Sequence, residues 1–308
     1  MHKKVVVILL LLLLTGAAVV LNGSGHWKKA ESEKIAIIHV EGVILGGRGQ
    51  SGFLSEQGGT DQLIRLLHQA RDDQAVKAVV LRINSPGGSA PASQEVGEEI
   101  MKLRSSGKVV VTSMGDIAAS GGYWLAACTE RIYANPTTLT GSIGVYIPYA
   151  NWEELFKKVG IQQEKIKSGP HKDILSPDRP MTPEERAMLQ SMVDDIYQQF
   201  IQVVAEGRNM ELERVRQLAD GRVYTGNQAK ELGLVDELGN MYDAVEGAAA
   251  LAGIHGKPKL QEYGKTSPWQ MLTGGETQGL LRQMLLPTLP NAPQQLAPLA
   301  LPENWQVK

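Results

Sequence analysis

The chain has 308 residues, 43% of them hydrophobic, which is enough for a sizeable core in one large domain or two small ones. Its formal net charge of -2 at pH 7 gives no electrostatic support for nucleic-acid binding. The single cysteine, Cys128, excludes an intrachain disulfide and a metal site built from cysteines. Its position among alanines predicts a buried structural thiol.

The N-terminus predicts a membrane anchor over residues 1–22. Lys3 and Lys4 precede an apolar run over residues 5–21, and a membrane-spanning helix needs about 17–25 such residues. The lysines are expected to stay in the cytoplasm, which places the rest of the chain on the extracytoplasmic side of the cell membrane. A cleaved signal peptide is the alternative, because small residues occur at 16–18.

The main domain is expected to begin after a polar linker, residues 23–33. The β-branched run Ile35–Val40 predicts its first strand. After a glycine-rich loop, leucines at helical spacing predict a helix capped by Thr60-Asp61.

Two strand–loop–helix units then follow one another. The first has a strand over 76–83 and a helix over 91–103, and the second has a strand over 109–111 and a helix from Trp124. Two such units in succession favour an α/β fold with a parallel sheet.

The second half of the domain alternates further strands and helices. Strands are predicted over 131–134, 138–145 and 163–167, and helices over 152–159, 182–207, 211–219, 226–231 and 241–251. The clearest helix has Thr182 as its N-cap, Glu185 completing a capping box and Gly207 at its end. The predicted domain covers residues 34–265, and residues 266–308 form a Pro/Leu-rich tail expected to be flexible.

Ser120 is the candidate nucleophile. It lies at a predicted strand-to-helix turn and is surrounded by alanines and glycines. Small neighbours allow a substrate backbone to approach, and a helix N-terminus offers N–H groups to a developing oxyanion. The alternative is a tight glycine-rich packing corner without catalytic function.

An activated serine needs a base. The six histidines cannot be placed beside Ser120 from the sequence, so the usual histidine partner stays open. A lysine can also serve if burial lowers its pKa from the usual value of about 10.4 toward neutrality. Lys172, in the loop 167–173, is a candidate, and a solvated loop lysine is the alternative.

Four segments together resemble the short, bacterial form of signal peptide peptidase A. They are 84–88 (Asn-Ser-Pro-Gly-Gly), 116–123 (Asp-Ile-Ala-Ala-Ser-Gly-Gly-Tyr), 140–145 (Thr-Gly-Ser-Ile-Gly-Val) and 168–173 (Ser-Gly-Pro-His-Lys-Asp). The resemblance covers about 35–253 and implies a fold of the Clp protease/crotonase type, built from repeated ββα-like units. It also implies a homo-oligomer with active sites at subunit interfaces, and no cofactor or metal.

The resemblance further implies a Ser–Lys dyad, with Ser120 as nucleophile and Lys172 as general base. Gly121 with Gly88 or Gly87 would supply the backbone N–H groups of an oxyanion hole.

Three further residues are candidates for supporting or substrate-binding roles. Ser168 would hold the lysine amine, or only cap its loop. Ser142 and Gly144 would line the substrate cleft, or belong to a core strand.

These features predict a membrane-anchored serine endopeptidase that degrades remnant signal peptides after preprotein processing. Its substrates would be apolar peptides. A crotonase-like acyl-CoA enzyme is one alternative, disfavoured because acyl-CoA is cytosolic and the anchor implies export. A non-catalytic membrane scaffold is another, disfavoured because both dyad positions are present.

Overall fold

The computed structural model describes residues 33–47, 49–52 and 55–264. The chain divides into two compact units, one that ends at Tyr263 and one that begins at Gly264, and the sheet and the candidate site belong to the first. The predicted anchor and nearly all of the predicted linker and tail lie outside the described residues. Among the residues that are described, no helix is both long and apolar enough to cross a membrane.

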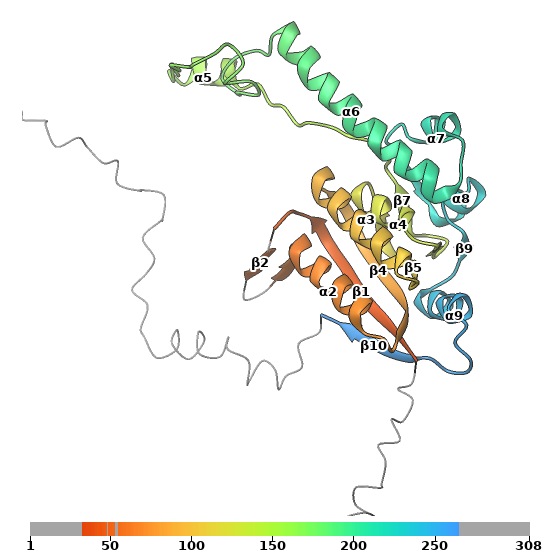
Figure 1. Ribbon diagram of the computed structural model, residues 1–308. Coiled ribbons are helices and arrows are strands. Elements are labelled where there is room, and N and C mark those ends of the chain that lie inside the picture. The colour runs from red at the N-terminus through yellow and green to blue at the C-terminus, as the bar shows by residue number, and fades with distance from the viewer. Residues whose placement is uncertain (1–32, 48, 53–54, 265–308) are drawn as a thin grey trace, which may run out of the picture. The chain divides into compact units, whose positions relative to one another are not determined.

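The centre of the fold is an eight-stranded sheet (Figure 1). Its main path runs β10-β1-β4-β5-β6-β9, and each neighbouring pair on this path is parallel. These strands are β1 (Lys34–Ile44), β4 (Val76–Gly88), β5 (Val109–Ala119), β6 (Arg131–Ala134), β9 (Glu237–Leu238) and β10 (Lys259–Tyr263). The predicted parallel sheet is confirmed.

Shorter strands complete the β structure. β7 (Leu139–Gly141) pairs parallel with the end of β5 and antiparallel with β8 (Val223–Thr225). β2 (Gly49–Gly52) and β3 (Ser55–Gly58) form a separate antiparallel pair.

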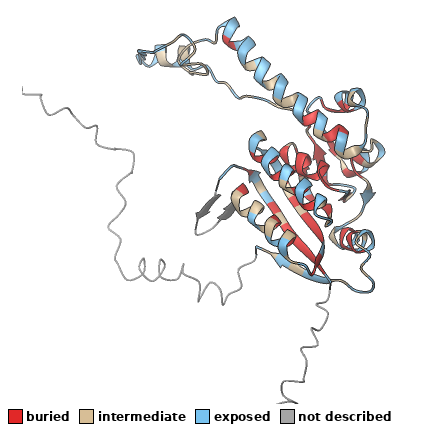
Figure 2. Ribbon diagram, in the orientation of Figure 1, coloured by how far each residue is buried: buried red, intermediate tan, exposed pale blue. Residues whose placement is uncertain are grey.

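Alternating strand residues fill two cores, one on each face of the sheet. Ala36, Ile38 and Leu81 pack into the core covered by α2 (Thr60–Asp72), α3 (Ala90–Ser105) and α4 (Gly121–Ala127). Ile35 and Val80 pack on the opposite face against α9 (Met241–Leu251). The protein is therefore a mixed α/β fold, and Figure 2 shows the buried centre of its sheet between helices.

The long helix α6 (Pro183–Arg208) begins as predicted, with Thr182 and Glu185 forming the capping box. It ends one residue beyond the predicted end, because Asn209 adopts the left-handed conformation and Gly207 packs within the helix against Ala127. The remaining helices are α5 (Glu153–Lys158), α7 (Leu212–Leu218) and α8 (Gly226–Glu231).

Several predictions of secondary structure are wrong. β4 runs to Gly88 and β5 to Ala119, beyond the predicted ends at 83 and 111, and α4 begins at Gly121 rather than Trp124. The strand over 138–145 is only β7, because positive φ angles at Gly141 (79°) and Ser142 (48°) end it. Residues 163–167 form no strand, and no described strand lies beside them to pair with. Gly59, not Thr60, is the N-cap of α2.

Candidate active site

Ser120 occupies the turn between β5 and α4 with φ 52° and ψ −121°. A positive φ is uncommon for a residue with a Cβ and costs conformational energy, so the surroundings must hold it. Its backbone N–H donates to the carbonyl of Gly141 at 2.9 Å, and its carbonyl accepts from the N–H of Trp124 at 2.9 Å. The predicted strand-to-helix turn is present, and it is strained at the serine.

The glycines at the end of β4 lie directly against this turn. A Cβ on Gly87, which has φ 98°, would lie 2.6 Å from the Gly121 nitrogen and 2.7 Å from Ser120 Cβ. A Cβ on Gly121 would lie 3.3 Å from the Gly88 nitrogen. Only residues without side chains allow the two backbone turns to come this close.

The two turns meet because β4 and β5 are parallel neighbours whose carboxyl ends lie at the same sheet edge. Asn84 Oδ1 accepts from the N–H groups of Asp116 and Ile117 at 3.1 and 3.2 Å. Thr140 Oγ1 donates to the carbonyl of Ala118 at 2.7 Å. These side chains hold β5 where the sheet register becomes irregular, and so position Ser120.

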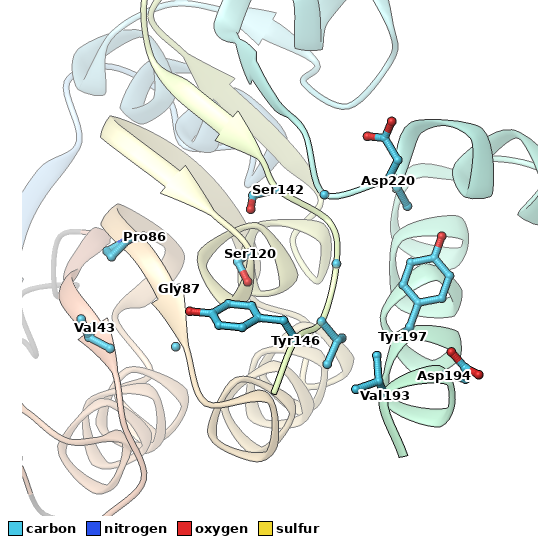
Figure 3. Close-up of a pocket in the computed structure, with 15 residues that line it drawn as sticks. Val43, Pro86, Gly87, Ser120, Ser142, Tyr146, Val193, Asp194, Tyr197 and Asp220 are labelled. Carbon is cyan, nitrogen blue, oxygen red and sulfur yellow. The ribbon is translucent and has the colours of Figure 1, made fainter. Parts of the chain in front are cut away.

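A pocket of about 600 Å³ opens over Ser120 (Figure 3). One side is formed by Ser120, the glycine turn of β4 and residues 142–146, and the other by α6 and the turn at 219–221. The lining residues are Val43, Pro86, Gly87, Gly88, Ser120, Ser142, Gly144, Val145, Tyr146, Val193, Asp194, Tyr197, Ala219, Asp220 and Gly221. Of the predicted site residues, Ser120, Gly87, Gly88, Ser142 and Gly144 therefore share one cavity.

Lys172 and Ser168 do not join this group. Both are exposed, and neither lines the pocket. Figure 1 shows that the segment between α5 and α6, which contains them, lies beyond the N-terminal end of α6 and away from the sheet. A single protomer therefore presents the candidate nucleophile without the candidate base beside it.

Comparison with known proteins assigns the family. Residues 102–255 match the model for peptidase family S49. The chain is 42% identical over 254 residues to a putative protease of Synechocystis sp., an alignment covering 82% of this chain and 87% of that protein. The chain belongs to peptidase family S49. The sequence-based resemblance is thereby confirmed.

Two other relatives agree with this assignment. A putative signal peptide peptidase SppA of Enterococcus faecium is 40% identical, with 70% of this chain and 63% of that protein covered. A chloroplastic serine protease SPPA of Arabidopsis thaliana is 37% identical, with 72% of this chain but only 33% of that protein covered. The chain is therefore a serine peptidase, and the acyl-CoA enzyme and scaffold alternatives are set aside.

Several pocket residues of this S49 peptidase were not predicted. Tyr146, Val193, Asp194, Tyr197 and Asp220 line the pocket. A pocket wall and a packing face on α6 have the same helical periodicity, so the sequence pattern cannot separate them. Only the position of α6 across from Ser120 identifies Val193, Asp194 and Tyr197 as pocket residues.

The described histidines and the cysteine lie outside the pocket. His39, His68 and His171 each face a glutamate, and none lines the pocket. Cys128 is buried as predicted, and its burial raises the pKa of the thiol to about 12. No cluster of three or more metal-binding side chains occurs within the described part of the chain.

Proposed function

We propose that this S49 peptidase is a membrane-anchored endopeptidase that cleaves remnant signal peptides with a Ser120–Lys172 dyad. The observation that carries the proposal is the strained Ser120 at the floor of a pocket, with glycine backbone packed against it. The name of the Enterococcus faecium relative supports signal peptides as the substrate class.

The chemistry follows from the order of groups around Ser120. Its Oγ attacks the scissile carbonyl and gives its proton to the neutral Nζ of Lys172. The Gly121 N–H, at the first turn of α4, has no acceptor within the helix and is aimed at the carbonyl oxygen. Lys172 then returns the proton to the leaving amine, and water hydrolyses the acyl-enzyme by the same steps in reverse.

Gly88 is the favoured second donor of the oxyanion hole. The Gly87 N–H already donates to the Ser85 hydroxyl at 3.1 Å, which leaves the Gly88 N–H of that turn for the substrate. The Gly88 nitrogen also lies near the Cα of Gly121. Both donors would then come from adjacent backbone turns.

In this proposal a neighbouring copy of the chain delivers Lys172. None of residues 144–184 is buried in the protomer, although this segment is rich in large apolar side chains. Five of them are between 48% and 104% exposed: Trp152, Leu155, Val159, Ile161 and Ile166. Exposed apolar surface of this kind marks an interface, and assembly would desolvate the amine, which favours its neutral form.

The membrane anchor and the extracytoplasmic location rest on the sequence. Lys3 and Lys4 before the apolar run 5–21 support a single span with the peptidase domain outside the cytoplasm. The Clp protease/crotonase type of repeated unit is likewise part of the proposal, which the parallel sheet supports.

Hydrolysis of a fluorogenic apolar peptide tests the dyad. Wild type, Ser120→Ala and Lys172→Ala proteins are compared, with assembly monitored by light scattering. The proposal predicts that both variants assemble normally and lose at least about 10³-fold in kcat/KM. Activity retained by assembled Lys172→Ala would show that another base operates.

A further inference from the structure

A cluster of charged side chains organises the loop that contains Lys172. The next residue, Asp173, accepts through Oδ1 from Lys167 Nζ at 2.6 Å and from Arg179 Nη2 at 2.8 Å. Its Oδ2 accepts from Arg179 Nε at 2.9 Å. Arg179 therefore grips this carboxylate with two parallel donors, the geometry in which a guanidinium fixes a carboxylate most firmly.

The same guanidinium also grips the first turn of α6. Arg179 Nη1 and Nη2 donate to Glu185 Oε2 at 2.9 Å and Oε1 at 2.6 Å. Glu185 has a side chain only 2% exposed, and its Oε2 also accepts from the Thr182 N–H at 3.0 Å in the capping box. Arg179 thus connects the Lys172 loop to Glu185, the buried capping-box residue at the N-terminus of α6.

The other contacts that fix this loop within the protomer are polar: Lys165 Nζ donates to Asp178 and Ser176, and the Trp152 N–H donates to the Pro177 carbonyl at 2.6 Å. No residue from 144 to 184 is buried, so the segment has no hydrophobic core of its own. The Tyr149 hydroxyl donates to the Arg179 carbonyl at 2.6 Å, which ties the start of the segment to the same residue. Arg179 therefore connects both ends of the segment to the helix, in addition to these contacts between the two ends.

We propose that Arg179 is a positioning residue for catalysis: by bridging Asp173 and Glu185 it sets the place and the electrostatic surroundings of the Lys172 amine. This inference rests on the proposed function, because it assigns a role through Lys172. Arg179 itself touches neither substrate nor reacting atoms.

The charges around the loop determine in which direction the pH profile of kcat/KM should shift when Arg179 is replaced. The Arg179 guanidinium holds the pKa of the Asp173 carboxyl well below its usual range and that of Glu185 at about 2, so both are ionised at neutral pH. Lys167 contacts Asp173, and the nearby His171 faces Glu184 at 3.6 Å. Without Arg179, the Asp173 carboxylate, one residue from Lys172 in the chain, is neutralised only by Lys167 among the described residues.

The test compares pH profiles of kcat/KM for assembled wild type, Arg179→Gln and Asp173→Asn. For Arg179→Gln we expect a loss of about 10–100-fold, mostly in kcat, from a misplaced base. The ascending limb of the pH profile of this variant should move to higher pH by about half a unit or more, as expected for one uncompensated charge nearby. Asp173→Asn should move the same limb to lower pH, because it removes the carboxylate.

Two further variants complete the design. Arg179→Lys keeps the charge but cannot bridge both carboxylates. The ascending limb of its pH profile should therefore lie near that of wild type, and its kcat should lie between those of wild type and Arg179→Gln. Arg186→Gln removes one arginine charge from the exposed side of α6 and should leave the profile unchanged.

Opposite limb shifts for Arg179→Gln and Asp173→Asn would support the inference, because a purely structural defect gives both variants the same direction. Limbs that stay fixed in both variants, or that move together, would overturn it. If Lys172→Ala retains activity, the proposed dyad fails instead, and this result is separable because it does not involve Arg179. If Arg179→Gln does not assemble, the other two variants still decide: a limb shifted to lower pH in Asp173→Asn with a wild-type limb in Arg179→Lys supports the inference, and any other pattern overturns it.

Discussion

The residues around Ser120 show which parts of a site a sequence discloses. Ser120 and the glycines of both turns could be predicted because their small neighbours and the strand-to-helix change are local patterns. The left-handed φ of Ser120 could not, since it depends on its backbone hydrogen bond to Gly141, a residue of a different strand. Local sequence thus marks the proposed nucleophile, and tertiary contacts determine its geometry.

Gly87→Ala tests the contact between the two turns. Its Cβ would meet the Gly121 nitrogen and Ser120 at 2.6–2.7 Å, so the proposed oxyanion donors must move. We expect a loss of at least about 10²-fold in kcat/KM, the usual cost of a lost oxyanion donor. Steady-state hydrolysis of the fluorogenic peptide measures it.

Gly107→Ala is the matched control. Gly107 also has a positive φ, 88°, but a Cβ there meets nothing within 4 Å. It should lose about 1–2 kcal/mol of stability from the backbone strain alone, with activity unchanged. Equal activity losses in the two variants would argue against a specific role for the close approach at Gly87.

Among the elements, α6 shows which features are determined by residues close in the sequence and which depend on tertiary contacts. Its start was predicted because Thr182 and Glu185 form a capping box within four residues. Its end was not, because Gly207 looks like a helix terminator in the sequence but serves as a contact point with α4. The pocket wall on the same helix could not be predicted from the sequence either, because it depends on which element faces α6.

Gly207→Ala should destabilise the protein, contrary to helix propensity. In an exposed helix this change stabilises by about 1 kcal/mol. Here the added Cβ would lie 1.8 Å from the Ala127 carbonyl oxygen, and such overpacking costs about 1–3 kcal/mol. Thermal unfolding should show a lowered midpoint for Gly207→Ala and little change for Glu206→Ala, its exposed neighbour; a raised midpoint for Gly207→Ala would refute the contact.

The Glu185–Arg179 pair predicts a pH-dependent stability. The pKa of Glu185 is lowered to about 2 when folded, so its contribution is present above the ordinary value near 4.5 and is lost as the pH falls toward 2. The difference in unfolding midpoint between wild type and Glu185→Gln should therefore be largest at neutral pH and shrink below about pH 4. A difference that is constant from pH 7 to pH 3 would contradict the ion pair.

At the scale of the whole molecule, the α/β class was predictable because successive strand–loop–helix units and buried β-branched runs repeat along the chain. Apart from its helix α5, the course of the segment 144–184 was not, because none of its residues is buried within the protomer. The strand predicted over 163–167 lacks a neighbour for the same reason. A single chain contains both proposed catalytic residues but does not bring them together.

Mixing two inactive variants tests most directly whether the site is completed between copies of the chain. Ser120→Ala supplies Lys172, and Lys172→Ala supplies Ser120, so subunits are exchanged at a 1:1 ratio and peptide hydrolysis is measured. Random assembly predicts recovery of about one quarter of wild-type activity per site, because half of the subunits carry each functional residue. No recovery despite demonstrated subunit exchange would contradict a shared site and would place both catalytic residues within one subunit.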